Sequence, residues 1–253
     1  MSPSPSPMST VVAEAISRPA ARVRTKTSFY VVLSIFMVAI VFAGFWPSYY
    51  GPLLQGTAER PLVVHLHGAV FIGWMALLMT QAALSWRGRV QMHRQVGRWG
   101  IAYGFLVLTM GVIVGVAAPV IHVQTGEWTR DRAAGFLLVT FGDMVLFGSL
   151  FVAAVVYRRK PEIHKRLMLG ATVALLFAAI GRLQLIDRVP LVAAGVWLSP
   201  LLIGMAYDWR TRGRPHAAYV ISVVWLFLGA TRVLLTESAA WQPIGHAILS
   251  VFV

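Results

Sequence analysis

The stretch Thr27–Trp46, TSFYVVLSIFMVAIVFAGFW, contains twenty consecutive residues without a charge. As a helix it would measure about 30 Å, the thickness of the hydrocarbon core of a bilayer. The apolar region of a signal peptide has only about 7 to 15 residues. We therefore interpret this stretch as a retained membrane helix.

Six further apolar stretches are long enough to cross a bilayer. They are Leu62–Ser85, Gly97–Pro119, Ala133–Tyr157, Leu167–Ile186, Val189–Ala206 and Ala217–Leu235. Their apolar runs are continuous, whereas barrel strands alternate and have only about ten residues. The sequence therefore predicts an all-α polytopic membrane bundle of seven transmembrane helices within residues 27–235. It also predicts a disordered cytoplasmic tail at 1–26 and an interfacial segment at 236–253.

The basic residues predict how the chain crosses the membrane. There are 22 Lys and Arg against 9 Asp and Glu, giving a formal charge of +13. If the N-terminus is inside, sixteen basic residues fall in inner segments and four in outer segments, as the positive-inside rule requires. We therefore expect the N-terminus inside, the C-terminus outside, and a bacterial inner (cytoplasmic) membrane location with the lipid bilayer as partner. Because this rule explains the basic residues, nucleic-acid binding is not expected.

Each inner loop repeats one arrangement: an aromatic residue, a basic run, and a His seven positions after the aromatic residue. The copies are WRGRVQMH (86–93), YRRKPEIH (157–164) and WRTRGRPH (209–216). Helix N-termini and nearby Arg and Lys disfavour the imidazolium, and neutral imidazole is the form that binds metal or haem iron. With no Cys in the chain, we predict that His93, His164 and His216 bind a transition metal, or that two of them bind haem b. In the alternative interpretation, each His bonds a loop carbonyl or a lipid headgroup.

Three charged residues lie inside the expected spans: Asp143, Arg182 and Arg232. Counted from the inner ends of those spans they have similar heights, which predicts a buried ion network. His67, in the motif HLHG (65–68), reaches a comparable level and is a further predicted cofactor ligand. These residues indicate a polar cavity that opens outward and suits an anion, a haem propionate or a proton path. The alternative is a structural ion pair that sets helix register.

Three motifs carry a resemblance to known families: HLHGAVFIGWMALLMTQ (65–81), GRVQMHRQVGRWG (88–100) and HKRLML (164–169). With these motifs the chain resembles uncharacterised bacterial multi-pass inner-membrane families of unknown function, which implies a helical bundle and no particular activity. More distantly, His residues on successive helices are similar to the b-type haem bundles of the cytochrome b561 and haem A synthase families. In this sequence, however, the inner His residues lie at helix starts.

Three functions remain open from the sequence. The first is a redox or cofactor protein that binds haem or metal through its inner His residues, with a possible membrane redox partner or complex. The second is transport or sensing of a small anion or protons through the cavity of Asp143, Arg182 and Arg232. The third is an accessory subunit of a larger membrane complex. No catalytic residue is predicted.

Overall fold

The structure, a computed structural model, describes residues 28–57, 59–183 and 188–253. Within these ranges every regular element is helical, as predicted. The elements are α2 (Phe29–Phe45), the π-helical turn η1 (Trp46–Tyr50), α3 (Gly51–Leu54), α4 (Leu62–Trp86), α5 (Val90–Gln124), α6 (Arg130–Val156), η2 (Tyr157–Arg159), α7 (Pro161–Arg182), α9 (Pro190–Arg212), α10 (Ala217–Ala230), η3 (Thr231–Leu235) and α11 (Gln242–Leu249). The expected tail at 1–26 and the last residues of the fifth expected span lie outside the described residues.

Seven helices of the described chain are long and apolar enough to cross a membrane, which confirms the predicted number. Three of them begin earlier than expected: α5 at Val90 instead of Gly97, α6 at Arg130 instead of Ala133, and α7 at Pro161 instead of Leu167. The predicted starts of these spans lie beside the charged residues that flank each apolar run. Helical hydrogen bonding continues through those residues, since Arg and Lys are good helix formers.

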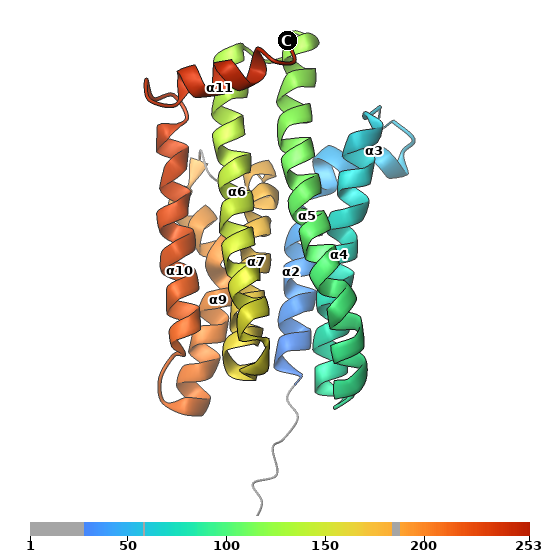
Figure 1. Cartoon of the computed structure of the whole chain (residues 1–253), viewed down its shortest axis with the longest axis vertical. Helices are drawn as coiled ribbons and strands as arrows, with labels where there is room; N and C mark the ends of the chain where they lie inside the picture. Colours follow the sequence, from blue (N-terminus) through green and yellow to red (C-terminus); the bar gives the residue numbers. More distant parts are fainter. Residues whose placement is uncertain (1–27, 58, 184–187) are drawn as a thin grey trace, which may run out of the picture.

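Helix α7 lies in the middle of the bundle (Figure 1). It packs against α2, α6, α9 and α10. In its most apolar stretch of 18 residues 61% is buried, against 11–39% in the corresponding stretches of the other six spans. Small residues permit this close packing, because Gly170, Ala171, Ala174 and Ala179 are all buried. The positions of the other helices therefore follow from how closely each can approach α7.

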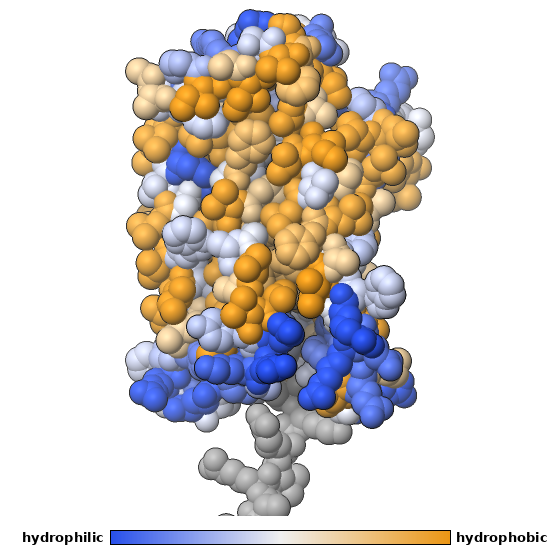
Figure 2. Space-filling model, viewed as in Figure 1, coloured by the Kyte–Doolittle hydropathy of each residue, from blue (hydrophilic) through white to orange (hydrophobic). Residues whose placement is uncertain are grey.

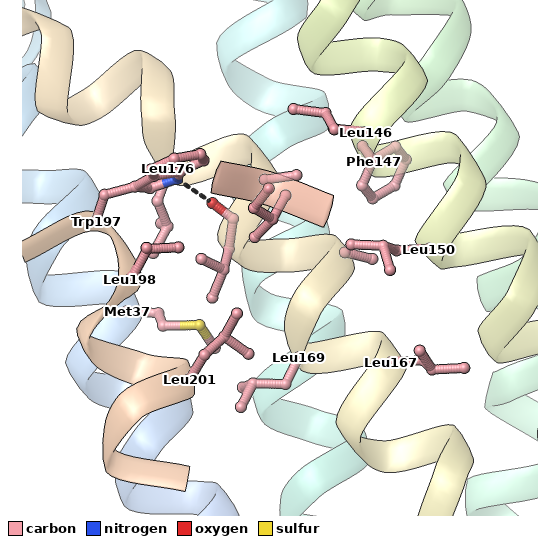
Figure 3. Close-up of a cluster of buried hydrophobic side chains, with 14 of the residues drawn as sticks. Met37, Leu146, Phe147, Leu150, Leu167, Leu169, Leu176, Trp197, Leu198 and Leu201 are labelled. Carbon is pink, nitrogen blue, oxygen red and sulfur yellow. Dashed lines mark hydrogen bonds between the residues drawn. The ribbon is translucent and has the colours of Figure 1, made fainter. Parts of the chain in front are cut away.

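The main apolar core surrounds the middle of α7 (Figure 3). Leu176 of α7 and Leu201 of α9 are fully buried, as is Phe147 of α6 on the other side. The Nε1–H of Trp197 donates to the Val173 carbonyl oxygen at 2.8 Å, which satisfies the indole inside the core. The middle of the bundle is thus filled by side chains.

The two ends of the bundle differ in polarity (Figures 1 and 2). Hydrophilic side chains gather below a broad apolar belt, at the end where α2 begins and where residues 86–93, 157–164 and 209–216 lie. We call this the basic end. At the opposite end, called the α11 end, α11 crosses above α6 (Figure 1), and the Trp241 Nε1–H donates to the Ala134 carbonyl oxygen at 2.7 Å. The apolar belt is what a multi-pass membrane protein requires.

Helix α2 comes very close to α7 at Gly44. A Cβ built at Gly44 would lie 2.4 Å from the Ala179 carbonyl oxygen. Gly44→Ala should therefore force the two helices apart and cost about 1 to 3 kcal/mol. The measurement is the midpoint of thermal unfolding of the detergent-solubilised protein. Gly195→Ala is the matched control, because a Cβ there has no atom within 4 Å, and it should leave the midpoint unchanged or slightly raised. Equal losses in both variants would contradict the close approach.

Candidate functional site

Two of the predicted ligands, His93 and His164, lie together at the basic end. Their ring centroids are 6.5 Å apart and the ring planes are perpendicular. The His93 Nδ1 lies 3.3 Å from the Gln81 carbonyl oxygen, and the His164 Nδ1 lies 2.8 Å from the Ala154 carbonyl oxygen. The first two copies of the loop pattern thus bring their His residues to one place.

The same local structure places both rings. Gly88, with φ 72°, reverses the chain after α4, and His93 lies in the first turn of α5. Pro161 is the first residue of α7, where its missing N–H costs nothing, and His164 lies in the first turn of that helix. Each His therefore bonds a carbonyl in the last turns of the preceding helix.

These bonds determine which ring nitrogen is available. A carbonyl oxygen only accepts hydrogen bonds, so each Nδ1 carries the ring proton, and the Nε2 of the neutral ring keeps its lone pair. Metal-bound His shows the same arrangement, with the second ring nitrogen donating to a carbonyl or carboxylate. His93 and His164 therefore both carry an Nε2 lone pair that could bind a metal or haem iron.

His216 has a different role. It is the N-cap of α10, where its Nδ1 accepts from the Ala218 backbone N–H at 3.1 Å and its own backbone N–H donates to Asp208 Oδ2 at 3.1 Å. Its Nδ1 lone pair is therefore used by the backbone. Across the described ranges, no three His, Asp or Glu side chains lie close enough together to hold a metal. The structure thus does not form the predicted three-His site, because Asp208 and the cap hold His216 at the start of α10.

A buried ion cluster also lies at the basic end. The sequence interpretation counts Arg166 and Asp208 as loop charges, but each is only 1% exposed. The Nε and Nη2 of Arg166 donate to the two carboxylate oxygens of Asp208 at 2.9 and 2.5 Å. Its Nη1 donates to Glu162 Oε2 at 2.8 Å, which also accepts from Arg212 Nη1 at 2.6 Å. This cluster joins α7 to α9, and loss of one partner would leave a buried charge.

Asp143 of α6 pairs with Arg232 of η3, as predicted. The Arg232 guanidinium donates to the Asp143 carboxylate, and also to the carbonyl oxygens of Val139 at 3.2 Å and Gly229 at 2.6 Å. Both side chains are buried. The pair joins the end of α10 to α6 and satisfies both charges away from water.

The third member of the predicted network, Arg182, is not part of this pair. Its Nη1 donates to the Ala178 carbonyl oxygen at 2.8 Å, one turn earlier on α7. Its guanidinium carbon lies 4.3 Å from the centroid of the Phe45 ring. In the described chain, the predicted three-residue network is therefore an Asp143–Arg232 ion pair, and Arg182 is a separate cation.

Arg182 and Asp143 lie at different heights in the bundle, and the early start of α7 explains why. The bond between the His164 ring and the Ala154 carbonyl puts these two residues at one level. From that level Arg182 lies 18 residues along α7, about 27 Å, and Asp143 lies 11 residues along α6, about 17 Å. The expected equal heights are wrong because the count for α7 began at Leu167 instead of Pro161.

A cavity of about 1270 Å³ lies toward the α11 end, where α5 and α6 extend past the end of α7 (Figure 1). Asp143 and Arg182 line it, together with the apolar side chains of Phe136 and Phe177. Gln242, the first residue of α11, also lines it. A cavity is thus present beside the charged residues where the sequence predicts one.

His67 is far from the other predicted ligands. Its ring packs on Phe71 with centroids 4.1 Å apart. Its Nδ1 is buried without a hydrogen-bond partner. Fourteen residues of α4, about 21 Å, separate it from Gln81 beside His93. His67 therefore cannot share a site with His93 and His164.

Comparison with models of protein families, with curated proteins and with solved structures found no match for this chain. The resemblances described from the sequence therefore remain expectations.

The cap at His216 predicts a pH dependence of stability. Burial lowers the pKa of His216 below its usual 6.5, and Arg166 and Arg212 lower it further. The unfolded chain therefore binds this proton more readily than the folded one, so stability should fall as the pH drops below about 6.5. The midpoint of thermal unfolding, measured between pH 7 and pH 5, should fall less in His216→Asn, which keeps a capping oxygen that does not titrate.

A second variant separates the cap from the titration. His216→Ala removes the acceptor and should cost about 1 kcal/mol even at pH 7, whereas the Asn variant should not. An Asn variant with the same pH dependence as the wild type would exclude His216 as its source.

Proposed function

We propose that this protein is a multi-pass membrane protein that binds a haem or a transition-metal ion through His93 and His164. The observation that supports this most is that two imidazoles from equivalent loops lie 6.5 Å apart, each held through Nδ1 by a backbone carbonyl. The positive-inside rule favours a cytoplasmic position for this end of the bundle, in a bacterial inner membrane.

The geometry of the pair fits one shared ion. Two imidazoles bound to the same ion at about 2.0 Å per bond have centroids about 6 Å apart, close to the observed 6.5 Å. Two protein ligands suit haem b, because the porphyrin supplies the other four nitrogens. A bare transition-metal ion needs more ligands. The side-chain oxygen of Gln81, which is buried without a hydrogen-bond partner, supports that alternative.

The role of the chain at this site is to present two neutral imidazoles in fixed orientations. The carbonyls of Gln81 and Ala154 hold the ring protons on Nδ1, and these hydrogen bonds would make each Nε2 a stronger ligand. A haem bound there would supply one-electron transfer, for which a membrane redox partner is the expected complement.

Removal of either ring should abolish cofactor binding. We expect His93→Ala and His164→Ala each to lose the Soret absorption band, or the bound metal, of protein purified from membranes of cells supplied with haem and trace metals. Absorption spectra of the oxidised and reduced forms test haem, and elemental analysis tests metal.

His216→Asn is the matched control for this experiment, because it changes the third His of the loop pattern while keeping its cap. It should retain the full cofactor content. Wild-type protein with neither a Soret band nor stoichiometric metal, in mild detergent and in native membrane fragments alike, would exclude the proposal. Equal cofactor content in all the variants would exclude it too.

A second candidate function is the transport or sensing of a small anion or protons through the cavity beside Asp143, Arg182 and Arg232. The observation that favours it is that the cavity reaches the buried Asp143 carboxylate. Below this level Leu146, Phe147 and Leu150 are at most 4% exposed. Passage to the basic end would thus require the helices to move.

Asp143→Asn tests this second function. The amide keeps the shape of the carboxylate but neither titrates nor neutralises Arg232, so proton or anion flux into liposomes should be lost. Asp131→Asn is the control, since Asp131 lines the same cavity but is exposed. Flux that Asp143→Asn leaves unchanged, or wild-type liposomes without flux, would remove this candidate.

A further inference from the structure

The cavity toward the α11 end contains a cation that described side chains do not neutralise. Arg182 has five N–H donors, and the structure gives one hydrogen bond for them, to the Ala178 carbonyl oxygen. That carbonyl belongs to the last turn of α7, whose partial negative charge is only about half a unit. Phe45 covers one face of the guanidinium. No carboxylate of the described residues pairs with it.

The acidic side chains of the same cavity are otherwise engaged or exposed. The Asp143 carboxylate pairs with Arg232, and Asp131 Oδ1 lies 2.8 Å from His246 Nε2. Glu237 lines the cavity as an exposed residue. Among the described lining residues, Arg132 and Arg182 therefore have no carboxylate partner. Arg132 packs on Trp128, whereas the exposed Arg182 side chain has most of its N–H donors unused, which favours an anion beside Arg182.

The walls around this charge are largely apolar. Phe136, Val139 and Phe177 line the cavity, and Ala118 and Gly135 leave room between them. The volume of about 1270 Å³ exceeds the roughly 300–1,000 Å³ of pockets that hold drug-sized molecules. A bare inorganic ion would leave these walls without a contact, so a ligand with an apolar body fits better.

We propose that this cavity binds an amphipathic monoanion, a carboxylate or phosphate on an apolar body, with its acid group on Arg182. The inference deepens the second candidate function and rests on the cavity being a binding site; it does not depend on His93 and His164. A free organic acid and the headgroup of an anionic phospholipid share this chemistry.

The test uses the whole protein in phosphatidylcholine nanodiscs, titrated with octanoate by calorimetry. Octanoate should bind at least about tenfold more tightly than octanol, which has the same chain without the charge. Arg182→Gln should weaken octanoate binding by about tenfold or more. Arg158→Gln is the matched control, because Arg158 is also exposed and donates to a carbonyl oxygen of its own helix, but it lies at the basic end away from the cavity. The affinity of this variant should stay within about twofold of the wild type.

Two outcomes overturn the proposal: octanol that binds as tightly as octanoate, or an Arg182→Gln variant with wild-type affinity. The first comparison uses wild-type protein, so it remains decisive if Arg182→Gln fails to fold. Arg182→Lys, which keeps the charge, should then fold and retain binding.

A third titration identifies the source of the anion. If octanoate affinity falls as phosphatidylglycerol replaces phosphatidylcholine, the lipid headgroup occupies the site; if it does not change, a free acid does. Either result supports the site only together with the Arg182 dependence. Because calorimetry measures binding without flux, a protein that binds octanoate but transports nothing would disprove the second candidate function alone.

Discussion

The burial of α7 is the constraint on which the rest of the structure depends. A helix with neighbours on several sides must be narrow, and the glycines and alanines of α7 make it so. The surroundings of the two ends of α7 differ. At the start of α7, His164 and Arg166 face the neighbouring helices. At its end, α5 and α6 continue further and line a cavity together with residues of η3 and α11.

Hydropathy predicts the number of spans because twenty uncharged residues have few soluble alternatives. It predicts their ends poorly. Hydropathy places the start of a span at the edge of the apolar run, yet α7 begins six residues before Leu167. This error placed Arg182 level with Asp143 and assigned Arg166 to a loop. A Pro at position 161 followed by an unbroken helical stretch was the signal that could have corrected both.

The sequence predicts which His residues are candidate ligands better than it predicts which of them lie together. Spacing within a loop shows that His93, His164 and His216 are equivalent in sequence, and two of them do meet. The third differs because of Asp208, which lies on the preceding helix and binds the backbone N–H of His216. A contact from another helix cannot be read from the loop itself. The Asp143–Arg232 pair was predictable, because few charges lie inside the spans and opposite signs must meet there.

The close approach at Gly44 also limits how the molecule can change shape. Backbone packed on backbone has no side chain that can repack, so α2 and α7 form one rigid body. Helix α11 is packed on α6 in the same way, because a Cβ at Gly245 would lie 2.9 Å from the Ala134 Cα, and the Trp241 Nε1–H also donates to the Ala134 carbonyl oxygen. During exchange of a cavity ligand, α11 and α6 would therefore move as one unit, and α2 and α7 as another. The imidazole pair, about 27 Å below Arg182, would not be disturbed by it.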